Sequence, residues 1–278
     1  MVDKSLYTDR EHLTKKMYAT AELLALRIQS HKLYTRPEVD FASWVLDHVP
    51  WRGDEVVLDI GCGAGLYVEP VYDRLAQGGR LLLGDLSFGM LLDVAKSSSL
   101  SANLLNGDAM HLPLPDNCCD VVLANHMLYH VPSMDRAVIE AHRVLRSGGY
   151  LLAATNARDS MRGFVRLVQS AALALGYPIA VPESPVLIKF NLENGLSLFE
   201  NVFSNAKIFK FASALVFHSP EPAIAYLNSL SQTYKVLLAE ELNWDAVLDE
   251  AQRQIASIVA TRGEFLVSKT TGLFVATK

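Results

Sequence analysis

The feature that most constrains this chain is the segment Val56–Tyr67, which reads VVLDIGCGAGLY. Its apolar run is typical of a buried parallel strand. The three glycines that follow at every second position allow a sharp turn and a close approach of the backbone to a ligand. A helix is expected to begin near Leu66, with its free N–H groups facing the same ligand. The segment therefore predicts a nucleotide-type cofactor site in an α/β fold.

The spacing of the glycines indicates which cofactor fits. Dinucleotide-binding segments have the pattern G-x-G-x-x-G and receive a pyrophosphate at the helix N-terminus. Here the pattern is D-x-G-x-G-x-G, with Asp59 two residues before Gly61. A carboxylate at this point repels a pyrophosphate and suits a cationic amino-acid group. The spacing argues against an NAD-dependent dehydrogenase.

Further strands with polar ends follow in order along the chain. Leu81–Ser87 is a second apolar strand that ends at Asp85, whose carboxylate can accept hydrogen bonds from both hydroxyls of a ribose. Asp116–Asn125 indicates a turn and then a fourth strand. Asn125 and His126 are placed at its carboxyl end, where ligands bind in open α/β sheets. These side chains are expected to meet around one ligand.

Regular elements continue after the fourth strand. The apolar periodicity predicts a helix over Ser133–Arg146, which Ser147-Gly148-Gly149 ends. Tyr150–Thr155 is expected to be the fifth strand. The later elements expected are helices over Ser160–Leu175, Leu192–Phe203, Glu221–Ser229 and Trp244–Ala260, a proline-rich loop over 176–185, a strand over Ala206–Phe217, and strands Phe265–Ser268 and Leu273–Thr277 split by Thr270-Thr271-Gly272.

Together these segments resemble the class I S-adenosylmethionine (SAM)-dependent methyltransferases, most closely the UbiE-like, methyltransferase-11 type group. Val56–Tyr67 resembles motif I, Asn106–Pro115 resembles the segment G-D-A-x-x-L-P, and Leu145–Leu151 resembles the signature L-x-x-G-G-x-L. The resemblance implies SAM as cofactor and S-adenosylhomocysteine as its product. It also implies an α/β fold: a Rossmann-like, doubly wound sheet of seven mostly parallel strands with an antiparallel last strand.

The resemblance assigns the cofactor residues. In this family the glycine loop wraps the methionine part of SAM, an aspartate in the place of Asp108 accepts from the adenine amino group, and a residue in the place of Met90 packs on the adenine. The residues expected to bind SAM are Asp59, Gly61, Cys62, Gly63, Gly65, Asp85, Leu86, Met90, Gly107, Asp108, Ala109, Asn125 and His126.

The chain is expected to have three parts. Residues 1–50, with helices over Thr20–Lys32 and Glu38–His48, resemble the N-terminal lid of related enzymes. Residues 51–156 form the SAM-binding core. Residues 157–278 supply strands six and seven and helical cap insertions at about 157–190 and 219–262. The apolar and aromatic content of the cap suits an apolar or aromatic substrate. The residues expected to face the substrate are Tyr18, Arg27, His31, Tyr34 and Tyr129.

Two histidines near the expected methyl position are the candidates for a catalytic base. His126 directly follows strand four and His130 lies one turn further on, and histidine titrates near neutral pH. Methyl transfer is largely a matter of alignment, so a mechanism without a protein base, or with another residue as base, stays open. Enzymes that methylate exocyclic amines carry a tetrad [N/D/S]-P-P-[Y/F] here. The sequence Asn125-His126-Met127-Leu128 lacks it, which argues against adenine, cytosine or glutamine-amide acceptors.

Composition bounds the partners and the location. The net charge of −5 argues against a broad nucleic-acid surface. Three cysteines without a disulfide framework indicate a reducing compartment. We expect no metal site, because the sequence has no His/Cys cluster with the spacing of metal ligands. No apolar run approaches the roughly 18–20 residues of a membrane span, and no signal peptide is recognisable. We expect a cytoplasmic protein, monomeric or homodimeric, with a small-molecule substrate.

The leading hypothesis is a SAM-dependent methyltransferase that acts on an O, N or C atom of a small molecule under a helical cap. Two alternatives stay open. The acceptor could be RNA or protein, for which a cluster of basic residues around the cleft would be expected. The chain could also bind SAM without methylating, as a sensor or scaffold.

Overall fold

A central eight-stranded sheet organises the molecule, of which the computed structural model describes residues 7–18, 21–97, 103–177, 185–231, 234 and 242–278. The strand order is β1-β7-β8-β6-β5-β2-β3-β4. The strands are β1 (Thr35–Arg36), β2 (Val56–Ile60), β3 (Arg80–Asp85), β4 (Asn103–Asn106), β5 (Cys119–Leu123), β6 (Leu145–Asn156), β7 (Asn205–Phe217) and β8 (Phe265–Thr277). The run from β6 to β4 is parallel, whereas β8 is antiparallel to both of its neighbours.

This topology confirms the predicted Rossmann-like sheet and its antiparallel last strand. The predicted number of seven strands needs one correction. The short strand β1 adds an eighth at the edge, because Thr35 and Arg36 pair with Leu215 and Ala214 of β7. The segment that contains β1 was expected to belong only to the helical N-terminal part. Its two backbone pairings instead attach that part directly to the sheet.

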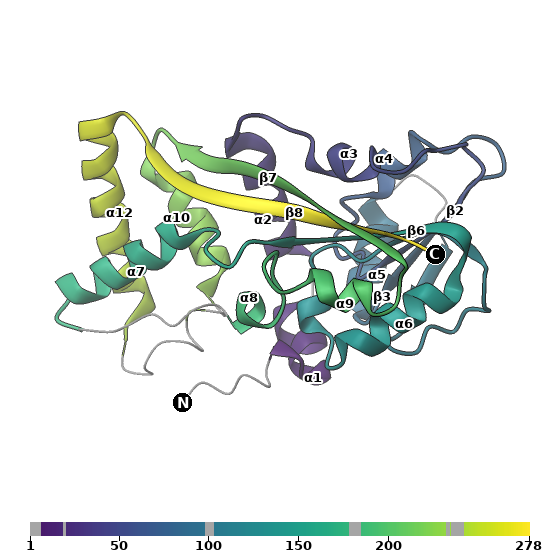
Figure 1. The fold of residues 1–278 in the computed structure, drawn as a ribbon. Coiled ribbons are helices and arrows are strands. Elements are labelled where there is room, and N and C mark those ends of the chain that lie inside the picture. The colour runs from purple at the N-terminus through teal and green to yellow at the C-terminus, as the bar shows by residue number, and fades with distance from the viewer. Residues whose placement is uncertain (1–6, 19–20, 98–102, 178–184, 232–233, 235–241) are drawn as a thin grey trace.

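Helices cover both faces of the sheet (Figure 1). They are α1 (Arg10–His12), the π-helical turn η2 (Leu13–Met17), α2 (Glu22–Tyr34), α3 (Phe41–Leu46), α4 (Val68–Tyr72), α5 (Phe88–Ser97), the 3-10 turn η3 (Leu128–His130), α6 (Met134–Val144), α7 (Arg162–Ala174), α8 (Pro185–Lys189), α9 (Leu196–Glu200), α10 (Pro220–Ser229) and α12 (Trp244–Arg262). Successive strand residues point to opposite faces, so Val57 packs with α3, α4 and α5, and Leu58 packs with α6 and α9.

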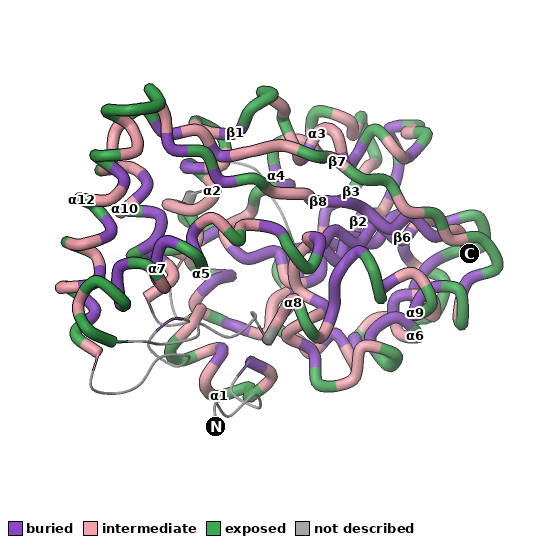
Figure 2. Tube along the Cα trace, turned by 60° about the vertical axis from the view of Figure 1, so that its left-hand side comes forward, coloured by how far each residue is buried: buried purple, intermediate pink, exposed green. Residues whose placement is uncertain are grey.

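The strands β7 and β8 are much longer than the rest of the sheet. They pair over their whole length, from Asn205↔Thr277 to Phe217↔Phe265, but β8 pairs with β6 only from Thr271 onward. The part of this strand pair beyond β6 extends to one end of the molecule, where α7, α10 and α12 pack on it (Figure 1). We call these three helices and the outer half of the β7–β8 pair the cap. The cap has its own buried core, and the central strands form the other buried region (Figure 2).

The predicted division of the last strand into two pieces is wrong. Thr270-Thr271-Gly272 was interpreted as a turn, yet β8 runs without interruption through it. A Cβ atom on Gly272 would lie 2.5 Å from the Phe209 carbonyl oxygen and 2.9 Å from Leu192 Cδ2. The glycine is therefore required for the close approach of two strands and a side chain, which is a second common use of glycine in sheets.

Other element boundaries also differ from the predictions. The helix expected near Leu66 begins at Val68, and the helix expected over Leu192–Phe203 is the shorter α9. α6 ends at Val144 because Leu145 already pairs with Cys119 of β5, and an irregular register separates this pair from the next. The loop expected over 176–185 lies mostly outside the described residues. Among the described helices, none is long and apolar enough to cross a membrane.

Candidate functional site

A cavity of about 750 Å³ lies at the carboxyl ends of β2, β3 and β5 and continues beneath α2 and the cap. This position is where open α/β sheets bind ligands. Its first half is lined by Asp59, Gly61, Cys62, Gly63, Asp85, Leu86, Met90, Gly107, Asp108, Ala109, Asn125 and His126. Its second half is lined by Tyr18, Arg27, Ile28, His31, Phe41, Tyr129, His130, Met161, Phe211, Tyr226, Leu230 and Lys269. The first half contains twelve of the thirteen residues that the sequence assigned to the cofactor; the exception is Gly65.

The glycine loop folds tightly between the sheet and its neighbours. Gly61 has a φ of +71°, and a Cβ atom there would lie 2.8 Å from Met127 Cβ. Gly65 has a φ of +79°, and its Cβ atom would lie 2.4 Å from Val94 Cγ2. Gly65 therefore packs against α5 and does not line the cavity. Gly65 was predicted to bind the cofactor, but in the structure it supports the glycine loop.

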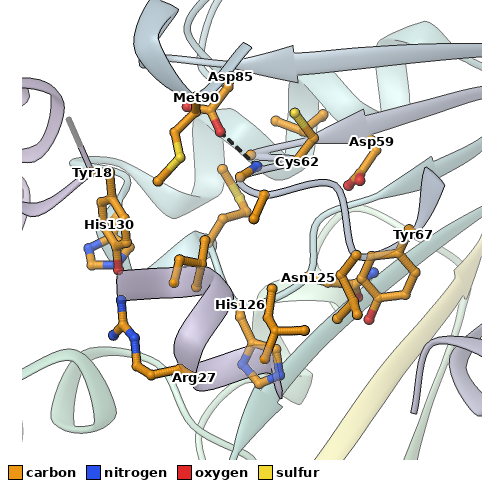
Figure 3. A pocket seen from close by; sticks show the side chains of 18 of the residues that line it. Tyr18, Arg27, Asp59, Cys62, Tyr67, Asp85, Met90, Asn125, His126 and His130 are labelled. Carbon is orange, nitrogen blue, oxygen red and sulfur yellow. Dashed lines mark hydrogen bonds between the residues drawn. The ribbon is translucent and has the colours of Figure 1, made fainter. Parts of the chain in front are cut away.

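Besides Thr35 Oγ1, three buried polar atoms of residues that line the cavity lack a hydrogen-bond partner within the described part of the chain. They are Oδ2 of Asp59, the hydroxyl of Tyr67 and Nδ2 of Asn125. The Asn125 amide is held in place because its Oδ1 accepts from the Ala154 amide at 2.9 Å. Figure 3 shows the three side chains on one side of the cavity. Buried polar groups are rarely left without a partner, so one carboxylate, one hydroxyl and one amide donor are available to a polar ligand.

Asp59 is also electrostatically unbalanced. Burial raises its pKa to about 7, and the neighbouring charge of Asp85 adds to this effect. The carboxylate lies at the end of β2 and is 2% exposed. A ligand cation placed here would stabilise the ionised form of Asp59. The site therefore fits the ammonium of an amino-acid group, as the sequence predicted.

Asp85 is oriented by backbone donors. Its Oδ2 accepts from the Gly63 amide at 3.0 Å and its Oδ1 accepts from the Ser87 amide at 2.8 Å, which connects the end of β3 to the glycine loop (Figure 3). Burial raises its pKa, and these hydrogen bonds oppose the shift. Each oxygen keeps acceptor capacity. Met90 and Asp108 also line the cavity, as predicted for the adenine end of the site. Met90 is 1% exposed, and Asp108 Oδ1 accepts from the Met110 amide at 2.9 Å.

His130 lies on the opposite side of the cavity from Asp59 (Figure 3). Its Nδ1 is 3.0 Å from the Tyr7 carbonyl oxygen, which can only accept, so Nδ1 donates. Nε2 then accepts from the Tyr18 hydroxyl at 2.9 Å. Burial lowers the His130 pKa to about 4. Both ring nitrogens are used, and His130 therefore fastens the N-terminal segment over the cavity.

His126 is less constrained. Its backbone has a φ of +54°, its amide donates to the Ala154 carbonyl at 2.9 Å, and its ring projects into the cavity (Figure 3). Burial and, to a smaller extent, the charge of Lys269 lower the His126 pKa to about 4. The imidazole is therefore neutral at pH 7 and binds a proton weakly. A general base is most effective when its pKa lies near the working pH, so this environment disfavours His126 as a strong base.

The second half of the cavity contains most of the residues expected to face the substrate. Tyr18, Arg27, His31 and Tyr129 line it. Tyr34 does not: its ring lies 4.9 Å from that of Phe217 in the cap core. Tyr34 is the last residue of α2, and there its ring packs against Phe217 of β7.

Sequence reasoning missed Lys269 and counted Tyr226 only among the aromatic residues of the cap, without a place in the site. Both side chains reach the cavity. The His31 ring connects them, with Nδ1 3.1 Å from Lys269 Nζ and Nε2 3.1 Å from the Tyr226 hydroxyl. No local pattern in the chain relates positions 31, 226 and 269. Lys269 stands between two predicted strands, in the polar stretch Ser268–Thr271, which gave no sign that it enters a site.

Comparisons with known proteins agree with this geometry. Residues 58–153 match a family described as a methyltransferase domain. The chain is 38% identical over 106 residues to the malonyl-[acyl-carrier protein] O-methyltransferase of Yersinia pestis, covering 38% of each protein. It is 37% identical over 102 residues to the demethylmenaquinone methyltransferase of Thermobifida fusca, covering 35% of this chain and 42% of that protein. The chain thus spans about two fifths of the length of these curated relatives.

Several solved structures resemble nearly the whole chain. The [4+2]-cyclase SpnF superposes with a TM-score of 0.60 at 15% identity, covering 96% of both chains. At this identity the likeness shows the fold alone. The comparisons show a methyltransferase domain over residues 58–153, with the predicted fold class and with SAM as its cofactor, and this match ends before the cap.

Proposed function

We propose that this class I SAM-dependent methyltransferase of the UbiE-like group transfers a methyl group from SAM to a small molecule held beneath the cap. The observation that supports this most directly is the continuity of the cavity. It joins Asp59, Asp85 and Asp108 at one end to His31, Tyr226 and Lys269 at the other. A donor and an acceptor could then meet near His126 without leaving the protein, which is the alignment that methyl transfer requires.

The proposed roles of the cofactor residues follow from their positions. Asp59 receives the ammonium of the methionine part, with Tyr67 and Asn125 as further polar partners, because all three have unused buried atoms. Asp85 accepts from the ribose hydroxyls. Met90 and Asp108 hold the adenine, as the family resemblance implies. SAM supplies an activated methyl group on a positively charged sulfur, and the chain supplies orientation and exclusion of water.

For the acceptor, we propose an apolar or aromatic body. The side chains around the second half of the cavity are mainly apolar, with Ile28 and Phe41 from the N-terminal part and Met161, Phe211 and Leu230 from the cap. His126 remains the candidate base for a hydroxyl acceptor. His130 is proposed as a positioning residue, because both of its ring nitrogens have partners.

The predicted division into lid, core and cap is retained as part of the proposal. It is supported by the separate cap core and by the contacts of α2 with both the cavity and the cap. A cytoplasmic location and a monomeric or homodimeric state also stay predictions. The three cysteines are free, with Cys62 and Cys119 buried, which is compatible with the reducing compartment predicted from the sequence.

Calorimetry with SAM, S-adenosylhomocysteine and NAD tests the proposal first. We expect binding of the two sulfur compounds and none of NAD, because Asp59 and the glycine spacing disfavour a pyrophosphate. Incubation with isotopically labelled SAM and a small-molecule extract, followed by mass spectrometry, should then reveal a methylated product. Tight NAD binding, or label only in RNA or protein, would contradict the proposal.

Replacing Asp85 by Ala should weaken SAM binding by about 1–3 kcal/mol, because the ribose hydroxyls lose a charged acceptor. Asp85→Asn keeps the shape and should have a smaller effect. Calorimetry measures both, and Asp135→Ala, at an exposed carboxylate in the first turn of α6, serves as the control. An affinity of Asp85→Ala equal to that of the parent would show that the ribose lies elsewhere.

A further inference from the structure

Lys269 occupies an unusual position for a lysine. It lies on β8, in the part that pairs with β7 but extends beyond β6, and its side chain lines the cavity. Burial lowers its pKa to about 8, and no charged side chain of the described residues contributes to that shift. A nearby carboxylate would raise the pKa of the ammonium. Lys269 therefore lacks an acidic partner within the described part of the chain.

The hydrogen bonds of Lys269 leave most of its donors unused. An ammonium can only donate, so Nζ donates to Nδ1 of His31 at 3.1 Å. The His31 pKa is lowered to about 3 by burial first and then by Lys269, so its ring is neutral at pH 7. The neutral ring then has its proton on Nε2, which donates to the Tyr226 hydroxyl at 3.1 Å. Lys269 is thereby held in position with two N–H donors free to bind a ligand.

The surroundings of Lys269 are cationic. Arg27, His126 and Lys269 each act to lower the pKa of His31, and Lys269 lowers that of His126. Among the described residues, no carboxylate acts on the pKa of these histidines or of Lys269. Arg27 makes no ion pair within the described residues, and its guanidinium points toward Tyr18 and His130 (Figure 3). Two cations thus face one chamber, and a partly buried charge without a counterion is unfavourable.

We infer that the methyl acceptor carries an oxyanion, a carboxylate or a phosphate, which Lys269 and Arg27 bind while the apolar part of the molecule lies against the cap. This inference rests on the proposed function and deepens it, since it names the acceptor class. Asp59, Asp85 and Asp108 lie at the cofactor end, where a cationic donor is expected, and Lys269 and Arg27 lie at the acceptor end. Glu38 and Asp40 also line the cavity, but neither acts on the pKa of Lys269, His31 or His126. An anionic acceptor completes this separation of charge. It would also be attracted toward the positively charged sulfur of the donor.

The test uses three ligands with the same ten-carbon chain: decanoate, decyl phosphate and decanol. Calorimetry on the full chain, saturated with S-adenosylhomocysteine, compares their dissociation constants. We expect the two acids to bind at least about tenfold more tightly than the alcohol, the size expected of hydrogen bonds to a charged group. The ratio between decanoate and decyl phosphate then distinguishes a carboxylate acceptor from a phosphate acceptor.

Three variants connect the preference to one side chain. Lys269→Met keeps the length and removes the charge, and it should reduce the preference for acids about tenfold or more. Lys269→Arg keeps the charge and should retain most of the preference. Lys210→Met removes an exposed lysine from the neighbouring strand β7, outside the cavity, and should change nothing. Circular dichroism and S-adenosylhomocysteine binding verify that each variant is folded.

The pH dependence supplies a second readout. Affinity for decanoate should be constant between pH 6 and 7 and fall as the pH rises through about 8, because Lys269 loses its proton. The other groups that face Lys269 do not titrate in this window. His31 and His126 are already neutral, and burial raises the Tyr226 pKa to about 12. An arginine side chain does not lose its proton in proteins. Lys269→Met should show no such fall.

The inference is overturned if decanol binds as tightly as the acids, if no acid binds, or if Lys269→Met retains the full preference. Failure of the proposed function gives a different result, because the unmodified chain would then not bind S-adenosylhomocysteine. Normal binding of that cofactor product without a preference for acids would contradict the oxyanion inference alone.

Discussion

Replacing Asp59 by Asn should weaken SAM binding by roughly a hundredfold or more at pH 7.5, the largest effect expected of a single cofactor residue. The carboxylate is 2% exposed and its Oδ2 has no partner within the described residues. Truncating one partner of a buried pair of charges costs about 2–5 kcal/mol. Asn keeps the shape but lacks the charge, so the loss measured by calorimetry would report the ionic contribution to binding.

The same variant should be more stable than the parent when SAM is absent. Burial raises the Asp59 pKa to about 7 in the folded state, far above the value of 3.8 for a free aspartate. Between these two pH values the folded state binds more protons than the unfolded chain, so stability falls as the pH rises through this window. Asparagine does not ionise, so the Asp59→Asn variant does not lose stability in this way as the pH rises. We expect its free energy of unfolding to exceed that of the parent by about 1–3 kcal/mol at pH 7.5, and the difference to vanish near pH 4.

The two effects separate a binding role from a structural one. SAM affinity of the parent should increase between pH 6 and 7.5 as Asp59 ionises, whereas the variant should show a flat profile. Measurements stop at pH 7.5 because a free α-amino group loses its proton near pH 8. Asp73→Asn, at an exposed position just after α4, is the control and should affect neither quantity. A destabilised Asp59→Asn variant with unchanged affinity would contradict the assignment.

Replacing Phe217 by Ala should lower the free energy of unfolding by about 3–5 kcal/mol, the usual cost of removing a buried aromatic ring. Phe217 is completely buried, and its ring lies 4.9 Å from Tyr34, 6.2 Å from Phe164 and 6.4 Å from Phe265. The Phe164 ring in turn stacks on the Tyr226 ring, with 5.1 Å between the ring centroids. The Tyr226 hydroxyl contacts His31 at the cavity. The cavity left by the ring would therefore loosen the wall of the acceptor half.

Hydrogen exchange and chemical denaturation measure this result. We expect faster exchange in α7, α10 and α12, while S-adenosylhomocysteine binding is retained because Asp59 and Asp85 lie in the other half of the molecule. Phe209→Ala on the same strand is the control, since that side chain is 36% exposed and should cost much less. Equal exchange throughout the chain, with loss of cofactor binding, would show that the cap and the core unfold as one unit.

The cofactor half of the site could be predicted from the sequence because its signals are local. Asp59 and Asp85 each end a strand, and parallel strands bring their carboxyl ends to the same edge of the sheet. Once the strand order is that of a doubly wound sheet, their meeting follows. The failures in the same region were also local in origin. Gly65 carries the same signal as Gly61 and Gly63, but it supports the loop from behind, and only its contact with Val94 shows this.

The sequence by itself determined the sheet, the methyl donor and the residues that face it, because backbone turns, strand ends and apolar periodicity depend on near neighbours in the chain. At the acceptor end, the sequence predicted Tyr18, Arg27, His31 and Tyr129, but only the tertiary structure added Lys269 and joined it to His31. Lys269 reaches the cavity because β8 continues through Gly272, where the absence of a side chain lets the strand pass close to Phe209. His31 of α2 forms a hydrogen bond with Lys269, and Tyr226 of α10 in turn forms one with His31. Side chains so far apart in the chain leave no periodic signal, since only packing brings them together.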